Sequence, residues 1–180
     1  MANKTTTKSE KLETTEEVVE VKTQSKKETN YIPTKIDNEQ LIVVKNGFQG
    51  TLIYKSSRTG EIFTWDSFGS EQEMELRELK SAKNTYKKFF INNWFMFEDD
   101  WVVDYLGLKQ YYKNAIPVED FDDIFDKPAN ELGKFIETLS DGQKQSVAYR
   151  AKQLITEKKI DSLKTIDALQ NALNIELIER

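Results

Sequence analysis

None of the 180 residues is cysteine or histidine, and this double absence restricts both the fold and the chemistry of the chain. A fold that has no disulfide and no standard zinc site must rest on a hydrophobic core. Ten Phe, seven Tyr and three Trp supply that core, and each large side chain contributes about 1.5–3 kcal/mol when fully buried. A Ser-His-Asp triad, a cysteine nucleophile and an imidazole proton shuttle are excluded. We therefore expect a binding or structural protein rather than an enzyme, with no cofactor and no metal ion.

The charge balance argues against a general nucleic-acid binder. The formal net charge is −5, whereas proteins that bind the phosphate backbone normally carry a basic excess. No stretch approaches the roughly 20 apolar residues of a membrane-spanning helix, and the polar start offers no apolar core of a secretory signal. The sequence thus predicts a protein of the cytoplasm that does not contact membranes.

Residues 1–30 are predicted to form a flexible arm, because they are almost all polar or charged. Their one apolar patch contains Val18, Val19 and Val21, inside the stretch from Glu16 to Lys22. Two interpretations remain open: a solvated tail, or an arm that orders on a partner by adding an edge strand to a neighbouring subunit. In the second interpretation the three valines are partner-binding residues.

Residues 31–116 are predicted to form an α+β domain that begins with a small antiparallel meander. Segments 41–45, 51–54 and 61–65 are rich in β-branched and aromatic residues and read as its three strands. The loop between the last two strands can turn through a positive φ at its glycine. This loop, called the hairpin tip below, is a second candidate partner-binding site and comprises Ser56, Ser57, Arg58, Thr59 and Gly60.

A long helix over residues 71–91 is expected to cover the meander. Ser70 and Glu73 have the spacing of a capping box, and apolar residues follow at intervals of three and four. Its inward stripe would be Leu76, Leu79, Ala82, Tyr86, Phe89 and Phe90. Two short helices are expected next, over about 100–106 with Gly107 at the C-terminal end, and over 108–114.

Residues 117–127 form an acidic linker in this interpretation, and residues 128–180 form a helical C-terminal unit of three short helices. Ser140 and Gln143 make a second capping box, and Asp161 or Ser162 caps the last helix. The stripes expected to face inward comprise Leu132, Phe135, Ile136 and Leu139; Val147, Ala151, Leu154 and Ile155; and Leu163, Ile166, Leu169 and Leu173.

Two acidic clusters invite a chemical interpretation that their spacing does not support. From Asp120, an EF-hand would place Ile124 and Phe125 where an oxygen ligand and a glycine are required. We expect Phe121, Ile124 and Phe125 to dock the linker onto a core instead. The second cluster, near Trp94 and Trp101, resembles an acid/base pair beside a sugar platform, yet acidic residues at a helix start also follow from the helix dipole. This cluster comprises Glu98, Asp99, Asp100 and Asp104.

The strongest nucleic-acid candidate is a lysine face on the expected long helix. Glutamates precede these lysines, an order that the helix dipole favours without any ligand. A solvated face is therefore the default interpretation, and nucleic-acid binding is the alternative. The lysine face comprises Lys80, Lys83, Lys87 and Lys88.

Two parts of the chain carry a pattern seen in a known group of proteins. The first comprises Gly50 to Tyr54, Arg58 to Gly60, Trp65, Phe68-Gly69, Glu78 to Lys80 and Phe89 to Trp94, and the second comprises Leu139 to Lys144, Ile160 to Ser162 and Glu176 to Glu179. Over about residues 41–179 the chain resembles small proteins encoded by tailed bacteriophages of low-GC hosts. The resemblance implies a virion structural protein, found in the infected cell and the virion, that binds other virion or assembly proteins or copies of itself. It carries no catalytic residues. The alternative is a phage regulator that binds nucleic acid or the host transcription machinery.

Overall fold

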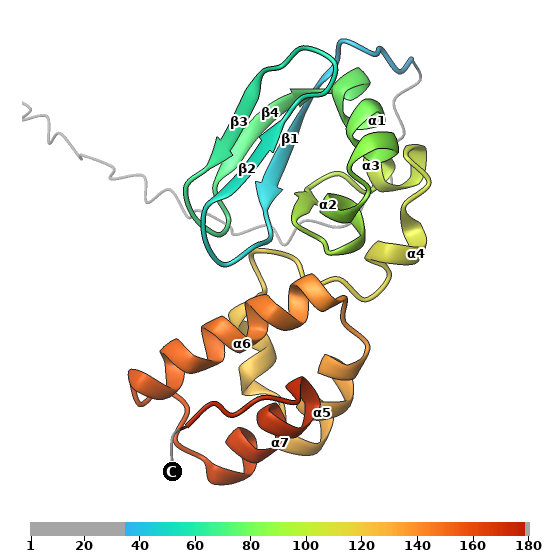
Figure 1. Cartoon of the computed structure of the whole chain (residues 1–180). Coiled ribbons are helices and arrows are strands. Elements are labelled where there is room, and N and C mark those ends of the chain that lie inside the picture. Colours follow the sequence, from blue (N-terminus) through green and yellow to red (C-terminus); the bar gives the residue numbers. More distant parts are fainter. Residues whose placement is uncertain (1–34, 179–180) are drawn as a thin grey trace, which may run out of the picture.

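The computed structural model describes residues 35–178, which divide into a β-rich half and a helical half (Figure 1). The arm residues Val18, Val19 and Val21 lie outside the described residues. The β-rich half comprises β1 (Leu41–Asn46), β2 (Leu52–Lys55), β3 (Ile62–Trp65), β4 (Glu71–Glu75), α1 (Leu76–Thr85), α2 (Lys88–Ile91), β5 (Phe95–Phe97), α3 (Asp100–Tyr105) and α4 (Lys109–Tyr112). The helical half comprises the 3-10 helix η1 (Asp122–Asp126), α5 (Ala129–Glu137), α6 (Asp141–Thr156) and α7 (Leu163–Leu173). The predicted α+β class, with antiparallel strands followed by a helical unit, is confirmed.

All three predicted strands form, and β2 pairs with β3 as the expected hairpin. In a simple meander β1 would pair with β2. Instead, β1 pairs antiparallel with β4 on one side and with β5 on the other. The side chain of Asn46 holds the loop after β1, because its Nδ2 donates to the carbonyl oxygens of Gly50 and Ser67. The hairpin remains joined to β1 through the indole of Trp65, which donates to the Val44 carbonyl at 2.8 Å.

The expected helix over 71–91 is wrong at its start. Residues 71–75 form strand β4, and the hydroxyl of Ser70 donates to the Ser67 carbonyl instead of capping a helix. The pairing of β4 with β1 decides this segment, because the tertiary ladder outweighs a local capping signal. Helix α1 begins at Leu76 and ends at Thr85, and Tyr86 leaves the helical region, so α2 is a separate turn. Tyr86 is consequently 41% exposed.

Two hydrophobic cores correspond to the two halves. The first lies between the sheets and α1 to α4, and Leu76, Leu79 and Ala82 of the predicted stripe are buried in it. The short helices α3 and α4 fall where they were expected, and Gly107 adopts a φ of 66° after α3. The largest fully buried side chains of this core are Trp65, Tyr54, Phe90, Phe95 and Met74.

The second core lies among η1, α5, α6 and α7, as the three-helix prediction requires. The hydroxyl of Ser140 accepts from the Gln143 N–H, and that of Ser162 accepts from the Thr165 N–H, so Ser162 is the cap of α7. Leu163 is 69% exposed and does not face inward as expected, because it is the first residue of its helix. The linker docks on this core through Phe121 and Ile124, which confirms that expectation.

A salt bridge joins the linker to α6 and makes stability depend on acid pH. The guanidinium of Arg150 donates to the carboxylate of Asp122 and lowers the pKa of that carboxyl. A lowered pKa adds stability above the ordinary pKa of aspartate, and this stability is lost as pH falls through the folded value. We expect Asp122→Asn to reduce the free energy of unfolding at pH 7 by about 0.5–1 kcal/mol. The difference should shrink as the pH falls below the ordinary aspartate pKa of about 3.9 and vanish below the lowered pKa of Asp122 in the folded state. Urea titrations at pH 7 and in strong acid check this; an equal deficit under both conditions would contradict it.

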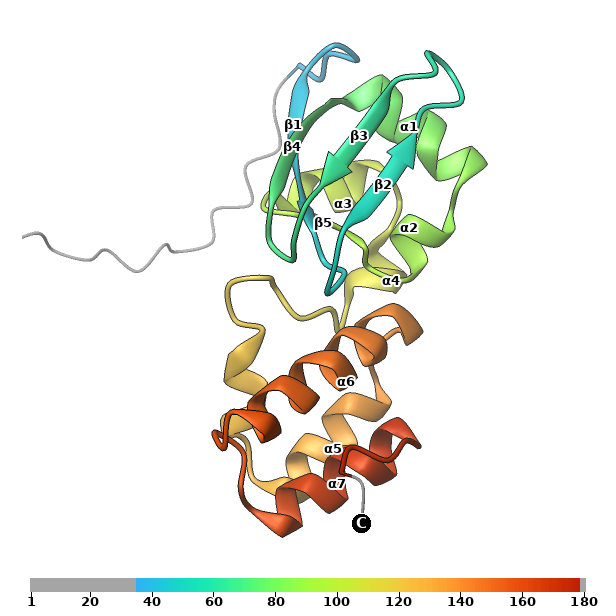
Figure 2. The same ribbon diagram turned by 60° about the vertical axis from the view of Figure 1, so that its left-hand side comes forward.

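The two halves meet where the first turns of α6 approach the β-rich half (Figure 2). The hydroxyl of Ser146 donates to the Gly47 carbonyl at 3.0 Å, and the side chain of Gln143 bonds both backbone groups of Ile116. A Cβ at Gly142 would overlap the carbonyl oxygen of Asn92. Close backbone contact therefore defines this joint between the halves.

Candidate partner-binding surface

The hairpin tip is ordered by its first residue. The hydroxyl of Ser56, only 2% exposed, accepts hydrogen bonds from the N–H groups of Arg58 at 3.1 Å and Thr59 at 3.0 Å. The Ser56 N–H donates to the Glu61 carbonyl across the hairpin at 2.8 Å. Gly60 adopts a φ of 79°, as the turn chemistry predicts. The tip is thus a well-defined turn, and its Thr59 and Gly60 remain exposed.

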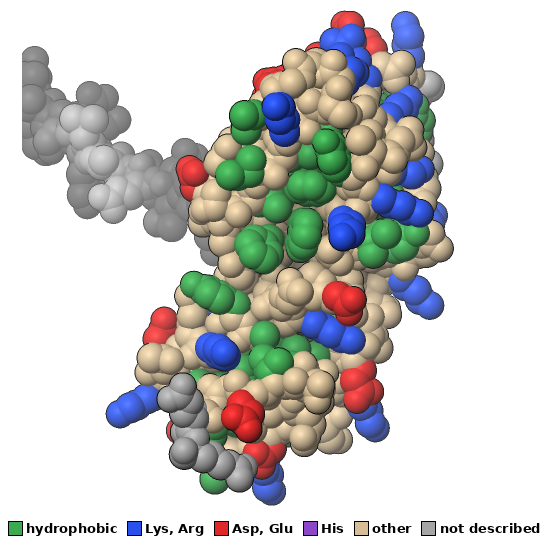
Figure 3. Space-filling model, in the orientation of Figure 1, with side chains coloured by type: hydrophobic (Ala, Val, Ile, Leu, Met, Phe, Trp, Pro, Cys, Tyr) green, Lys and Arg blue, Asp and Glu red, His purple; other side chains and the backbone are tan. Residues whose placement is uncertain are grey.

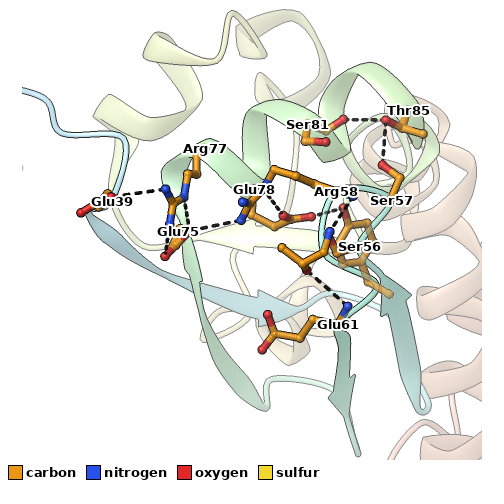
Figure 4. Close-up of polar contacts among 12 residues, drawn as sticks. Glu39, Ser56, Ser57, Arg58, Glu61, Glu75, Arg77, Glu78, Ser81 and Thr85 are labelled. Carbon is orange, nitrogen blue, oxygen red and sulfur yellow. Dashed lines mark hydrogen bonds and ion pairs between the residues drawn. The ribbon is translucent and has the colours of Figure 1, made fainter.

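A buried carboxylate anchors the tip to α1 (Figure 4). The side chain of Glu78 is 3% exposed and accepts from Arg58 Nε at 3.0 Å and from the Tyr54 hydroxyl at 2.7 Å. Burial of the phenol, and then its bond to Glu78, raises the pKa of Tyr54 well above its usual value. The phenol therefore stays protonated and acts as a donor. Because a buried charge is costly unless it is paired, this network fixes the tip in one position.

Further charged side chains surround the Glu78 network at the protein surface. Arg58 also reaches Glu75 at 3.3 Å, and Arg77 bonds both Glu75 and Glu39 (Figure 4). The hydrogen bond from Arg77 lowers the pKa of the half-buried Glu75 carboxyl. An open hollow of about 320 Å³ lies here and is lined by both arginines, several glutamates and the exposed Leu41. The arginines and glutamates that line this hollow therefore pair with one another.

The hairpin carries an apolar outer face beside the charged hollow. Ile53 on β2 is 60% exposed and Ile62 on β3 is 61% exposed, while Leu52, Tyr54 and Trp65 point into the core. Figure 3 shows hydrophobic side chains gathered on the near face of the β-rich half. Neighbouring exposed apolar residues of this size mark a candidate interaction surface.

One side of β2 has no strand beside it within residues 35–178. Ser56 and Glu61 form a hydrogen-bonded pair, and such pairs alternate with non-bonded pairs along an antiparallel hairpin. The backbone N–H and C=O groups of Tyr54 therefore face β3, and those of Ile53 and Lys55 face away from it. We call this row of outward-facing groups the open edge of β2. An edge of this kind is a template for an added strand.

Three of the four lysines of the lysine face make intramolecular contacts. Lys83 donates to the Leu106 carbonyl at the end of α3, and Lys80 donates to Asn38 Oδ1 and lies 4.8 Å from the ring centre of Tyr105. Lys87 lies over Tyr111, and it belongs with Lys88 to the turn after α1. The four lysines therefore do not share one helix, and nucleic-acid binding by them stays a prediction.

Part of the acidic cluster near Trp101 forms salt bridges. Asp104 pairs with Lys109 at 2.9 Å, and Trp101, 6% exposed, is a core residue and offers no sugar platform. Within the described residues, no group of three or more acidic, histidine or cysteine side chains has a geometry that holds a metal ion. None of the helices in that part of the chain is long and apolar enough to cross a membrane.

Comparisons of the chain with protein-family models, with curated proteins and with solved structures gave no match. The functional interpretation therefore rests on the surface itself.

Sequence reasoning placed the hairpin tip among the contact sites and missed the features that support it. In the sequence, Glu78 is one of the glutamates that precede the lysine face, where the helix dipole accounts for it, and nothing local indicates that it bonds Tyr54 and Arg58. Ile53 and Ile62 were recognised only as strand residues. Counting alternate positions from the turn at Ser56 would have placed Ile53 on the face opposite Tyr54.

Proposed function

We propose that this chain is a non-enzymatic structural or assembly protein that acts through protein-protein contacts, in the setting of a tailed bacteriophage and its virion. The observation that carries the proposal is the open edge of β2 beside the exposed side chains of Ile53 and Ile62. Backbone groups on such an edge give affinity to an added strand, and the neighbouring side chains give selectivity. The viral setting rests on the resemblance given above.

The anchored tip supports the same proposal. Interfaces that are ordered before binding lose less conformational entropy on association. The Glu78 network holds the tip in place through Arg58 and the C-terminal end of β2 through Tyr54. Contact area is what this surface offers to a partner.

The proposal predicts self-association or partner binding that depends on the hairpin face. We expect replacement of both Ile53 and Ile62 by lysine to abolish concentration-dependent association of the full chain in sedimentation velocity, because charge replaces the apolar contact. Both side chains are about 60% exposed, so the fold tolerates the change. Leu163→Lys is the matched control, since that leucine is 69% exposed on the helical half.

Mass spectrometry of purified virions, set against the infected-cell lysate, tests the viral setting. Enrichment of the chain in virions, or in particles that co-purify with assembly intermediates, is the expected result. A chain that sediments as a monomer at every concentration and is missing from every particle would refute the proposed function.

A further inference from the structure

Asn46 and Gly47 form the only Asn-Gly pair in the sequence, and they lie at the joint between the halves. We propose that Asn46 is a deamidation site that the fold keeps closed. Unfolding lets this asparagine lose ammonia, and the modified chain cannot rebuild the joint. The inference concerns a covalent change of the chain itself and goes beyond the proposed contact function.

The reaction needs only the chain and water. The backbone nitrogen of Gly47 attacks Cγ of Asn46, so a Cγ–N bond forms and the bond from Cγ to Nδ2 breaks. The nitrogen of Gly47 gives up its proton, and Nδ2 leaves with it as ammonia. Water then opens the resulting five-membered imide at one of its two carbonyls and leaves aspartate or isoaspartate. Glycine favours the attack because it has no side chain to hinder the close approach of its backbone.

The folded structure holds the attacking nitrogen away from this reaction. The Gly47 N–H donates to the Trp94 carbonyl at 2.8 Å, across the joint's β-rich side. The N–H of Asn46 donates to the Ser70 carbonyl at 2.9 Å, and Asn46 is also the last residue of β1 and pairs with Phe95 of β5. The main chain on both sides of the reacting bond is therefore fixed.

The leaving group is held as firmly as the nucleophile. Asn46 is 0% exposed, so water does not reach its amide. Its Nδ2 donates to the carbonyls of Gly50 at 2.8 Å and Ser67 at 2.9 Å, and its Oδ1 accepts from the Phe48 N–H at 2.8 Å. Deamidation must break these bonds, so it requires an opening of this part of the fold.

Neither product fits the folded site. Aspartate would set a carboxylate oxygen against the carbonyls of Gly50 and Ser67, where the fold has an N–H donor, and a buried charge without a donor is costly. Isoaspartate would lengthen the main chain by one carbon before Gly47, where even an added Cβ would lie 2.1 Å from the Asn93 carbonyl oxygen. The Gly47 carbonyl also accepts from Ser146 of α6, so the change reaches the contact between the halves.

Peptide mapping by mass spectrometry of the full chain, kept at mildly alkaline pH with or without urea, tests the protection. We expect the Asn46 amide to convert to acid at least about a hundredfold faster in urea, because the folded chain reacts only through openings. Asn114 is the internal control: it is exposed in the fold and followed by alanine, so its conversion should be slow and similar in both samples. Equal rates for Asn46 in both samples, or faster conversion of another asparagine in urea, would overturn the inference.

Two measurements test the consequence. Asn46→Asp is expected to lower the urea midpoint of unfolding by about 1 M or more, whereas Asn114→Asp should leave it unchanged. Chains deamidated in urea and returned to buffer should elute ahead of the native protein in size-exclusion chromatography, while chains left in urea too briefly to react should refold. An unchanged midpoint for Asn46→Asp, or modified chains that elute with the native protein, would refute the second half of the inference.

Discussion

Replacing Gly142 by alanine is expected to lower the free energy of unfolding by about 3 kcal/mol, the upper end of the usual cost of overpacking. Gly142 lies in the first turn of α6, where alanine would ordinarily favour the helix by up to about 1 kcal/mol. Here the added Cβ would overlap the Asn92 carbonyl and lie 2.8 Å from the indole nitrogen of Trp94. Because the obstacle is backbone, the halves must separate to admit the methyl group. Urea unfolding, followed by tryptophan fluorescence, measures the loss.

Gly133→Ala is the matched control for this prediction. Gly133 lies within α5. A Cβ added there would lie 3.8 Å from its nearest neighbour, the Ala168 carbonyl oxygen, which is an ordinary van der Waals contact. The substitution is expected to leave stability unchanged or to raise it by about 0.5–1 kcal/mol. Equal stability of the two alanine variants would show that the joint at Asn92 does not constrain α6.

Local signals predicted those parts of the fold that local interactions determine. Ser140 caps α6 because its partner, the Gln143 N–H, lies three residues away, and Gly107 ends α3 through its own backbone conformation. The side chain of Gln143 departs from the capping box, since it bonds both backbone groups of Ile116, which directly precedes the linker. That departure depends on a residue 27 positions away and leaves no trace in the local pattern.

The errors and omissions have the same origin. Residues 70–73 fit both a helix cap and a strand with alternating glutamates, and the ladder with β1 decides between them. The burial of Glu78 likewise depends on Arg58, 20 residues away, and on Tyr54, 24 residues away. The hairpin tip was recognisable from its turn residues, whereas the network that fixes it follows only from the packing of the hairpin against α1.

Replacing Arg58 by leucine is expected to cost about 2–3 kcal/mol of unfolding free energy, because it leaves the Glu78 carboxylate with only the Tyr54 hydroxyl. The cost falls below that of a fully buried pair, since the Arg58 side chain is 38% exposed and water screens it. Arg77→Leu is the control: it also removes a guanidinium from glutamates, but its partners Glu75 and Glu39 are 32% and 70% exposed, whereas Glu78 is 3% exposed. Its expected cost is below about 1 kcal/mol.

A second substitution separates loss of charge pairing from loss of packing. In the double variant Arg58→Leu with Glu78→Gln, the amide carries no charge and still accepts from the Tyr54 hydroxyl, so most of the lost stability should return. A double-mutant cycle in urea gives the coupling between the two side chains. If the cycle shows no coupling, the tip is held by its own turn at Ser56 and not by the carboxylate. If the coupling is large, the same variants should weaken association of the full chain, because the C-terminal end of β2 then loses its anchor on α1.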